Sequence, residues 1–191
     1  MIKKNKLAIF DMDGTLFDTR DVNYRAYKTA LTNCGLDNNI DYQYYCDMCN
    51  GKKYKDFLPK IVSNIMPTEM ESVHQEKKNI YSRYLQNAVI NEHLFRIIEL
   101  ISREYIIGLV TTASRKNAME ILNYFSVQDK FEIIITQEDV THVKPSPECF
   151  FLAMNLCKIS AKNTIIFEDS DVGLQAAKES GAQYYKVYGY N

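Results

Sequence analysis

The sequence predicts an α/β fold, with a doubly wound parallel sheet and a small helical domain inserted after the first strand. Two observations support this prediction. From about residue 92 onward, short apolar runs alternate with helical patterns, which is typical of parallel strands joined by right-handed crossovers. By contrast, about eighty residues without a convincing strand follow the first apolar run, far more than an ordinary crossover contains.

The size and charge of the chain limit what it can do. Its 191 residues can bury one main core with a smaller lobe, and 46% hydrophobic and 25% charged residues are usual for a globular protein. A net charge of -1 creates no field that would recruit nucleic acid or an anionic membrane. The first apolar run is too short for a signal peptide or a membrane span. We therefore expect a cytoplasmic protein with neither kind of partner.

Cysteine usage points to the same compartment. Five cysteines, an odd number, are scattered along the chain, which argues against a disulfide framework. Cys46 and Cys49 form a CxxC pair, but no second pair of Cys or His lies nearby in sequence to complete a zinc site. We interpret this pair as a coincidence of composition.

Five apolar runs are predicted to be strands. They are short, often β-branched and mostly non-alternating, which is the pattern of strands buried on both faces. In chain order they are residues 7–10, 106–110, 133–135, 164–167 and 184–188.

Four helices are predicted between the later strands. They cover residues 92–103, 115–125, 147–156 and 172–180. Pro147 suits a first helical position, and Gly181 ends the last helix.

The long stretch after the first strand is predicted to be helical. Apolar residues from Val22 to Cys34 repeat at helical spacing and end at Gly35. Thr68-x-x-Glu71 is a capping box that would open a helix reaching about residue 84, and two prolines, at positions 59 and 67, punctuate the segment between. We expect residues 1–17 and 91–191 to form the main domain and residues 18–90 the insert.

The most informative motif is Asp11-Met12-Asp13-Gly14-Thr15, directly after the first strand. Two carboxylates two residues apart at a strand end can face one crevice, since ligands bind at the carboxyl ends of parallel strands. Gly14 permits the sharp turn that exposes them. An Asx-rich turn is the plain alternative for these five residues alone.

Polar residues follow the later strands in the same way. Thr111 and Thr112 follow one strand, and a hydroxyl with the backbone amides of residues 111–113 is expected to form a phosphate cradle at a helix start. Thr111 alone would fit a helix cap. Glu168 and Asp169 follow another strand. Lys144 lies before the helix that starts near Pro147, where it could reach the same crevice.

Clustered acids repel one another unless a hard cation neutralises them. Asp11, Asp13, Glu168 and Asp169 offer the oxygen ligands that magnesium prefers. The sequence therefore predicts magnesium as the cofactor, and phosphoryl transfer as the chemistry.

In order and in context, these motifs resemble the four signature motifs of the haloacid dehalogenase-like hydrolases. Asp11-Met12-Asp13-Gly14-Thr15 resembles the first motif, Thr111 the second, Lys144 the third, and Glu168-Asp169-Ser170 with Gly173 the fourth. The resemblance spans nearly the whole chain. It implies a Rossmann-like core, and a helical cap formed by the insert, as in the phosphoglycolate phosphatase and β-phosphoglucomutase branch.

The resemblance also implies residue roles. Asp11 would be the nucleophile, and Asp13 the general acid and then the base. Thr111, Thr112 and Lys144 would bind and stabilise the phosphoryl oxygens. Magnesium would be held by the side chains of Asp11 and Asp169 and the backbone carbonyl of Asp13, with Glu168 as a helper.

These roles predict a magnesium-dependent phosphatase that hydrolyses a small phosphorylated metabolite through an aspartyl-phosphate. Asp13 disfavours dehalogenation, because the dehalogenases generally lack a carboxylate there. The β-phosphoglucomutases carry histidine where this chain has Asn23, which favours a hydrolase over the alternatives, a sugar-phosphate mutase or a non-catalytic phospho-ligand-binding module.

Other features of the sequence are given plainer interpretations. Gly51-Lys52-Lys53 resembles the family's specificity loop, but these lysines and Lys55 also fit a solvated basic patch. Asp171 is expected at a helix start. The three histidines, at positions 74, 93 and 142, are expected on helix surfaces or loops. The absence of an obvious coiled coil favours a monomer or a small homo-oligomer.

Overall fold

The computed structural model describes residues 4–36 and 40–188, and it divides into two compact units. The first unit comprises Met1–Asp18 and Val89–Asn191, and the second comprises Thr19–Ala88. We call the first the core unit and the second the insert unit, and describe each by itself. The sequence placed these boundaries at residues 17 and 91.

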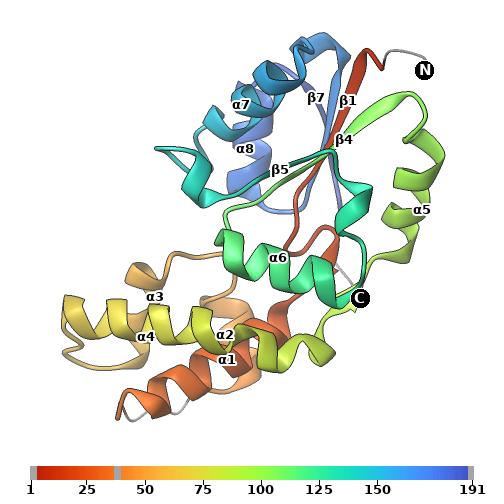
Figure 1. Cartoon of the computed structure of the whole chain (residues 1–191). Helices are drawn as coiled ribbons and strands as arrows, with labels where there is room; N and C mark the ends of the chain where they lie inside the picture. The colour runs from red at the N-terminus through yellow and green to blue at the C-terminus, as the bar shows by residue number, and fades with distance from the viewer. Residues whose placement is uncertain (1–3, 37–39, 189–191) are drawn as a thin grey trace. The chain divides into compact units, whose positions relative to one another are not determined.

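The core unit is built on a parallel sheet with the strand order β5-β4-β1-β6-β7 (Figure 1). Neighbouring strands pair in parallel throughout, which confirms the predicted α/β fold class. The strands are β1 Lys6–Phe10, β4 Tyr105–Val110, β5 Ile133–Ile135, β6 Thr164–Glu168 and β7 Gln183–Lys186. The first strand lies in the middle of the sheet, so its carboxyl end is flanked by two others.

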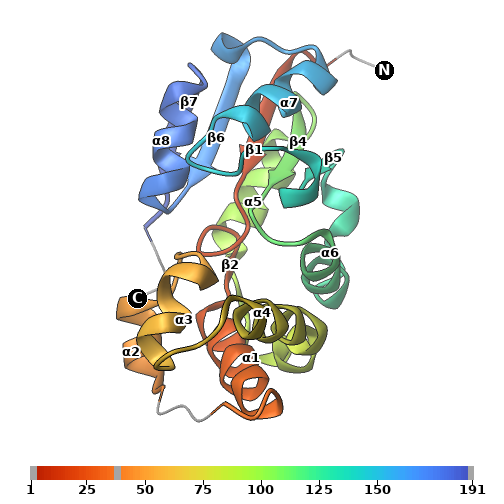
Figure 2. The same cartoon turned by 90° about the vertical axis from the view of Figure 1, so that its left-hand side faces the viewer.

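Helices cover both faces of this sheet. They are α5 Glu92–Ile101, α6 Arg115–Tyr124, α7 Glu148–Cys157 and α8 Asp171–Glu179. Figures 1 and 2 show α7 and α8 on one face and α5 on the other. Under α7 and α8 the core is aliphatic around Phe150, whereas on the other face the Phe10 and Phe167 rings stack with their centroids 4.6 Å apart. The predicted helices are confirmed to within a few residues, with Pro147 at the N-cap of α7 rather than inside it.

The last strand departs from the prediction. Residues 184–188 were expected to be buried on both faces, but every residue of β7 is exposed and the strand ends at Lys186. The reason is its place at the edge of the sheet, where only one neighbour pairs with it. Tyr185 still covers the aromatic face, because its ring lies 5.6 Å from that of Phe167.

The insert unit is helical, as predicted. Its helices are α1 Arg20–Asn33, α2 Tyr42–Met48, α3 Tyr54–Ile61 and α4 Pro67–Ile80, followed by the 3-10 helix η1 Tyr81–Asn87. The apolar stripe of α1 is buried, and Gly35 adopts the left-handed conformation (φ 73°) just beyond the helix. Tyr27, Tyr45 and Phe57 form the aromatic part of the core of this unit.

Two details of the insert unit correct the sequence interpretation. The capping interaction of α4 is made by Glu69, which accepts a 2.7 Å hydrogen bond from the Met66 amide, and the expected Thr68–Glu71 box is not the one used. The helix therefore starts earlier, at Pro67, which suits a position where no amide hydrogen is needed. Pro59 lies inside α3 rather than between helices, as the sixth of its eight residues, where it removes one backbone hydrogen bond of the helix.

A two-stranded antiparallel sheet lies where the chain leaves the core unit and where it re-enters it. It pairs β2 Phe17–Asp18 with β3 Val89–Ile90. The sequence did not predict it, because two-residue strands are too short to produce an alternating pattern. Asp18 is the second residue of β2, and Thr19 occupies the N-cap position of α1.

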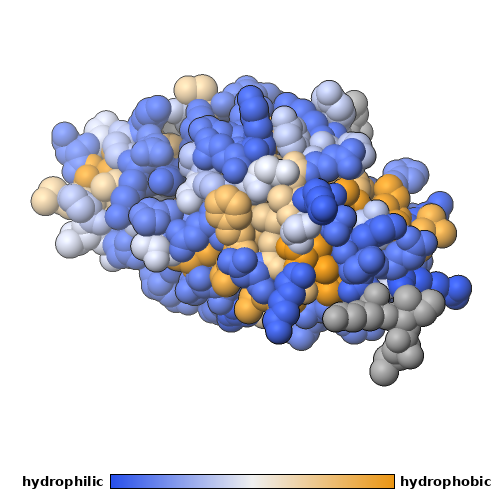
Figure 3. Space-filling view, turned by 90° about the horizontal axis from the view of Figure 1, so that it is seen from above, coloured by the Kyte–Doolittle hydropathy of each residue, from blue (hydrophilic) through white to orange (hydrophobic). Residues whose placement is uncertain are grey.

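The helices of the described residues are amphipathic rather than uniformly apolar. Among these residues, no helix combines the length and hydrophobicity needed to cross a membrane. Figure 3 shows one face of the molecule, on which apolar residues form a patch among hydrophilic ones. Exposed apolar side chains of the core-unit helices include Leu100, Phe151 and Leu156.

Candidate active site

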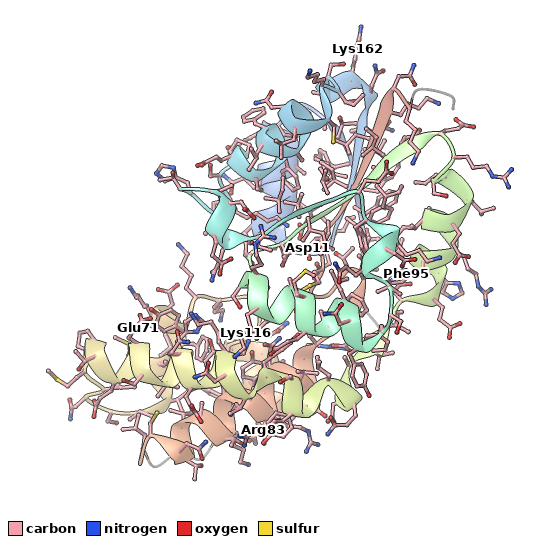
Figure 4. The ribbon with its side chains drawn as sticks, viewed as in Figure 1. Asp11, Glu71, Arg83, Phe95, Lys116 and Lys162 are labelled. Carbon is pink, nitrogen blue, oxygen red and sulfur yellow. The ribbon has the colours of Figure 1, made fainter. Side chains whose placement is uncertain are left out.

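The carboxyl ends of three neighbouring strands bring the predicted site residues to one edge of the sheet. Phe10, at the end of β1, is paired with Leu109 of β4 and with Phe167 of β6. Asp11, Thr111 and Glu168 therefore lie at or just past the ends of adjacent strands. Figure 4 labels Asp11 at this edge of the core unit.

Lys144 is bonded to groups at all three of these strand ends. Its Nζ donates hydrogen bonds of 2.6 Å to Asp11 Oδ1 and 2.6 Å to Glu168 Oε2, and one of 3.1 Å to the Val110 carbonyl at the end of β4. The side chains of Lys144, Asp11 and Glu168 are only 3%, 9% and 1% exposed. A lysine that the chain places 133 residues from Asp11 is thus bonded directly to it.

The turn after β1 holds a second acid in place. The Gly14 amide donates to the Phe17 carbonyl at 2.8 Å, and Gly14 has a φ of 88°, which favours glycine. A Cβ at Gly14 would lie 2.2 Å from Asp169 Oδ2. On the other side of the same carboxylate, Thr15 Oγ1 donates 2.9 Å to Asp169 Oδ1. The turn therefore both makes room for Asp169 and orients it.

Glu168 is held from the α8 side. Its Oε1 accepts hydrogen bonds from the Ser170 amide at 3.1 Å and the Ser170 hydroxyl at 2.7 Å. Ser170 is also the N-cap of α8, since its hydroxyl accepts from the Gly173 amide. A Cβ at Gly173 would lie 2.0 to 2.3 Å from the Glu168 carboxylate. Only glycine leaves that space for the acid.

Three acidic side chains form a cluster that could hold a cation. Asp11, Glu168 and Asp169 each offer one oxygen, and these oxygens lie within 4.8 Å of one another. Asp13 is outside this cluster of side-chain oxygens among the described residues. Three carboxylates against the single ammonium of Lys144 leave an excess of negative charge. A hard divalent cation would balance it.

The pKa values of these side chains reflect the same excess of negative charge. Burial, followed by repulsion from Glu168, raises the pKa of Asp169 to about 6, although the Thr15 hydrogen bond opposes the shift. Burial and the Glu168 charge also raise the pKa of Asp11, against the opposing effect of Lys144. Burial disfavours the Lys144 ammonium, but the charges of Asp11 and Glu168 outweigh it and raise its pKa. Lys144 is therefore a fixed positive charge in the site.

The Thr111 segment lies between the end of β4 and the start of α6. Thr111 is buried, and its Oγ1 accepts a 3.0 Å hydrogen bond from the Ala113 amide. Thr112 is exposed. The N-cap of α6 is Ser114, whose hydroxyl accepts from the Asn117 amide at 3.3 Å, so Thr111 is not the helix cap.

Sequence reasoning passed over two residues that orient the acids. Thr15 and Ser170 were quoted in the motifs without a role, yet each hydroxyl bonds one carboxylate of the cluster. The available signal was their spacing: a hydroxyl residue follows two positions after Glu168 and four positions after Asp11. A short side chain this close to a strand end has few partners other than the acids beside it.

Other singled-out residues have structural partners. Lys52 donates to the Met48 carbonyl at the end of α2 at 2.7 Å, and Lys55 lies over the Tyr54 ring. Asp171 is the first residue of α8, as expected. Cys46 and Cys49 are both free thiols.

Two of the three histidines fit the expectation, and one corrects it. His93 lies exposed on α5, and His142 lies in an exposed loop. His74, expected on a helix surface, is stacked on Tyr54 with centroids 4.0 Å apart and shares a 3.0 Å hydrogen bond with the Tyr27 hydroxyl. It is a packing residue of the insert unit.

Comparison with known proteins gives a family match over nearly the whole chain. A family model described as haloacid dehalogenase-like hydrolase matches residues 8–187. A phosphorylated carbohydrates phosphatase of Thermotoga maritima is 26% identical over 95% of this chain and 83% of its own length. The fructose-1-phosphate phosphatase YqaB of Escherichia coli is 25% identical over 91% of both chains.

Solved structures support the fold. CbbY from Rhodobacter sphaeroides, solved in complex with phosphate, superposes with a TM-score of 0.85 at 23% identity, covering 97% of this chain and 87% of that one. A match at this identity shows a shared architecture.

Proposed function

The chain belongs to the haloacid dehalogenase-like hydrolase family, and we propose that it is a magnesium-dependent phosphatase acting on a small phosphorylated metabolite. The observation that carries the proposal is the convergence of Asp11, Glu168 and Asp169 within 4.8 Å, with Lys144 bonded to the first two. Phosphoryl transfer needs a nucleophile, a positive charge and acids that can hold a metal ion. The Asp11 carboxylate, the buried Lys144 ammonium and the two further acids supply these groups.

In the proposed first step, an Asp11 carboxylate oxygen bonds to phosphorus while the ester bond to the leaving oxygen breaks. Asp13 donates a proton to that oxygen. In the second step, Asp13 accepts a proton from a water molecule, the water oxygen bonds to phosphorus, and the bond to Asp11 breaks, releasing inorganic phosphate. Dividing one displacement into two lowers the barrier of each.

Lys144 and the Thr111 segment are proposed to stabilise the phosphoryl oxygens. Lys144 keeps its charge because two buried carboxylates raise its pKa. The Thr111 hydroxyl and the exposed Thr112 lie just beyond the end of β4, beside the end of β1. Fixed donors in a buried site stabilise developing charge better than water does, because they need no reorganisation.

Asp11 and Asp169 are proposed to hold the magnesium ion by their side chains, with Asp13 contributing its backbone carbonyl and Glu168 as a helper. The donor set fits, because it consists of carboxylate oxygens with an excess of negative charge. Burial, followed by repulsion from Glu168, raises the pKa of Asp169 to about 6. When bound, the ion would neutralise charge on the phosphoryl oxygens. We also propose that the insert unit acts as a cap, and that the protein is cytoplasmic and a monomer or small homo-oligomer.

Phosphate release from a panel of small phosphomonoesters tests the proposed activity. Sugar phosphates lead the panel because two relatives are named phosphatases of phosphorylated carbohydrates and of fructose 1-phosphate. Each compound is assayed with magnesium and with EDTA, and Asp11→Asn protein serves as the blank. We expect magnesium-dependent release that Asp11→Asn lowers by at least about 10³-fold, since that change removes the nucleophile.

The competing activities give different results in the same assay. A sugar-phosphate mutase would interconvert isomers with little release, and a binding module would bind without turnover. Release that persists at the wild-type rate in Asp11→Asn would remove Asp11 as the nucleophile. A separate thermal-unfolding measurement tests the metal site: magnesium should raise the unfolding midpoint of the wild type, and the rise should be lost in Asp169→Asn.

A further inference from the structure

Lys144 lies in an irregular segment that must be held in place. Between β5 and α7, residues 136–147 contain only the short 3-10 helix η3 Gln137–Asp139. Yet the Lys144 Nζ makes two 2.6 Å hydrogen bonds to buried carboxylates. Contacts this short depend on where the backbone carries the lysine, so the segment needs support outside the acidic cluster.

Glu148 supplies a bond across this segment. Its Oε1 accepts a 2.7 Å hydrogen bond from the Thr141 amide, and its Oε2 accepts one of 2.9 Å from the His142 amide. The His142 ring lies 3.1 Å from the same Oε2. Glu148 follows Lys144 in sequence and its two amide partners precede it, so the carboxylate closes a loop around the lysine.

The interior of the loop is closed as well. The Ser146 amide donates to the Val143 carbonyl at 3.1 Å, which spans Lys144. The Ser146 hydroxyl accepts a 3.4 Å hydrogen bond from the Glu148 amide. The outer bonds made by Glu148 and this inner bond together determine where the Lys144 backbone lies.

We propose that Glu148 is a positioning residue for Lys144: its carboxylate closes the loop of residues 141–148 and so holds the ammonium against Asp11 and Glu168. This inference rests in part on the proposed phosphatase function, because the kinetic effect requires turnover. Glu148 itself touches neither Asp11 nor Glu168 through any of these bonds. It acts on the site through the backbone.

The charge of Glu148 matters as well as its shape. Two backbone amides point at a carboxylate that they hold ionised, and these hydrogen bonds keep the pKa of Glu148 below its ordinary value. In Glu148→Gln the amide group keeps one acceptor oxygen, but its NH2 faces an N–H donor. One of the two outer bonds must therefore be lost, with little change in volume.

The chain offers a matched control at Glu92. Both residues are the first residue of a ten-residue helix of the core unit. Glu92 is 72% exposed in its side chain and is paired with Arg96 of its own helix at 3.7 Å, with no loop to close. Glu92→Gln removes the same charge at the same helical position.

The first experiment measures Lys144 itself, independently of activity. Reductive methylation of the folded protein, followed by peptide mass spectrometry, gives the labelling rate of each lysine. Lys144 should react slowly in the wild type because it is buried and ion-paired, and the exposed Lys162, which Figure 4 places far from Asp11, is the internal reference. In Glu148→Gln the Lys144 rate should rise about tenfold relative to Lys162, since a hydrogen bond to a charged group is lost. Glu92→Gln should leave it unchanged.

The second experiment separates positioning from general loss of structure. With p-nitrophenyl phosphate and magnesium, Glu148→Gln should lower kcat about tenfold, and Glu148→Asp, which keeps the charge, should restore part of it. In a Lys144→Met background the additional effect of Glu148→Gln should fall below about twofold, because residues that act through one another are not additive. Circular dichroism establishes that each variant is folded.

The outcomes are distinct. An unchanged Lys144 labelling rate in folded Glu148→Gln protein would overturn the inference. So would an equal kcat loss with and without Lys144, which would mean that Glu148 acts elsewhere. If the wild type hydrolyses no phosphomonoester but Lys144 labelling still rises, the proposed function fails and the positioning role stands.

Discussion

Each of the two units buries a lysine side chain, and the two lysines lie against groups of different kinds. In the core unit, the buried Lys144 ammonium is bonded to two carboxylates, each at 2.6 Å. In the insert unit, the buried Lys77 ammonium lies over aromatic rings, 4.6 Å from the centroid of Tyr81 and 5.6 Å from that of Tyr27. One unit surrounds its buried lysine with opposite charges, and the other places aromatic faces against it.

This difference separates chemistry from packing. Charges held in a buried cluster interact strongly because little water screens them, and they can act on a bound phosphate. Ring contacts and neutral hydrogen bonds, such as that between His74 and Tyr27, contribute stability without creating a reactive group. We therefore expect substitutions in the core cluster to have the larger effects, and those in the aromatic cluster the smaller.

The largest expected effect on stability is that of Lys144→Met. It leaves Asp11 and Glu168 buried without their shared cation, and breaking a buried ion pair by removing one partner costs about 3–5 kcal/mol. Urea unfolding in EDTA measures the loss. Magnesium should recover part of it, because the acids then have another counter-charge; a variant as stable as the wild type in EDTA would contradict the ion-pair account.

Gly173→Ala should have the next largest effect. The added methyl group would lie 2.0 to 2.3 Å from the Glu168 carboxylate, so the acid must move away from Lys144. Overpacking costs about 1–3 kcal/mol, whereas alanine by itself would favour the helix by about 1 kcal/mol. We expect a net loss of stability together with a fall in kcat.

Gly35→Ala in the insert unit is the matched control. Nothing lies within 4 Å of a Cβ at Gly35, so only the strain of its positive φ of 73° remains. Its stability should fall, but its kcat should not. Equal losses of kcat in both variants would refute the specific role of the space beside Glu168.

The pH dependence of stability should carry the signature of His74. Burial, followed by repulsion from Lys77 and Lys78, lowers its pKa from 6.5 to about 4. Between these values the unfolded chain binds more protons than the folded one, so stability falls as the pH drops from 6.5 to 4 and gains nothing further above 6.5. Glu71 and Lys55 also face this imidazole.

His74→Gln isolates that contribution. Glutamine can still bond the Tyr27 hydroxyl but does not titrate. The difference in the free energy of unfolding between wild type and variant, measured from pH 4 to 7.5, should change with pH only below about 6.5. A constant difference would show that His74 is not held neutral.

The smallest expected effect is that of Tyr27→Phe. It removes the hydroxyl that pairs with His74 at 3.0 Å and keeps the ring that packs against Phe57. A single neutral hydrogen bond contributes about 1 kcal/mol, which denaturant unfolding can detect. A loss as large as that of Lys144→Met would erase the contrast between the two units.

Much of the fold could be predicted from sequence because the signals are local. Apolar runs identified the strands of the sheet, and glycines at positions 35 and 181 indicated where α1 and α8 end. The exposure of β7 could not be predicted, because a run of apolar and aromatic residues has the same sequence pattern in an edge strand as in a central strand. The capping bond of Glu69 was missed because its partner is the amide of Met66, and methionine is not a residue type that indicates a helix N-cap.

Which chemical groups follow which strands could be predicted from the sequence alone, since that order is a property of neighbouring residues. The folded structure was needed to show that Lys144 bonds both Asp11 and Glu168, that Gly14 and Gly173 leave room for two acids, and that Glu148 closes the loop around the lysine. Burial, charge balance and close contact depend on distances between residues far apart in the chain. Those distances exist only once the sheet has brought its strand ends together.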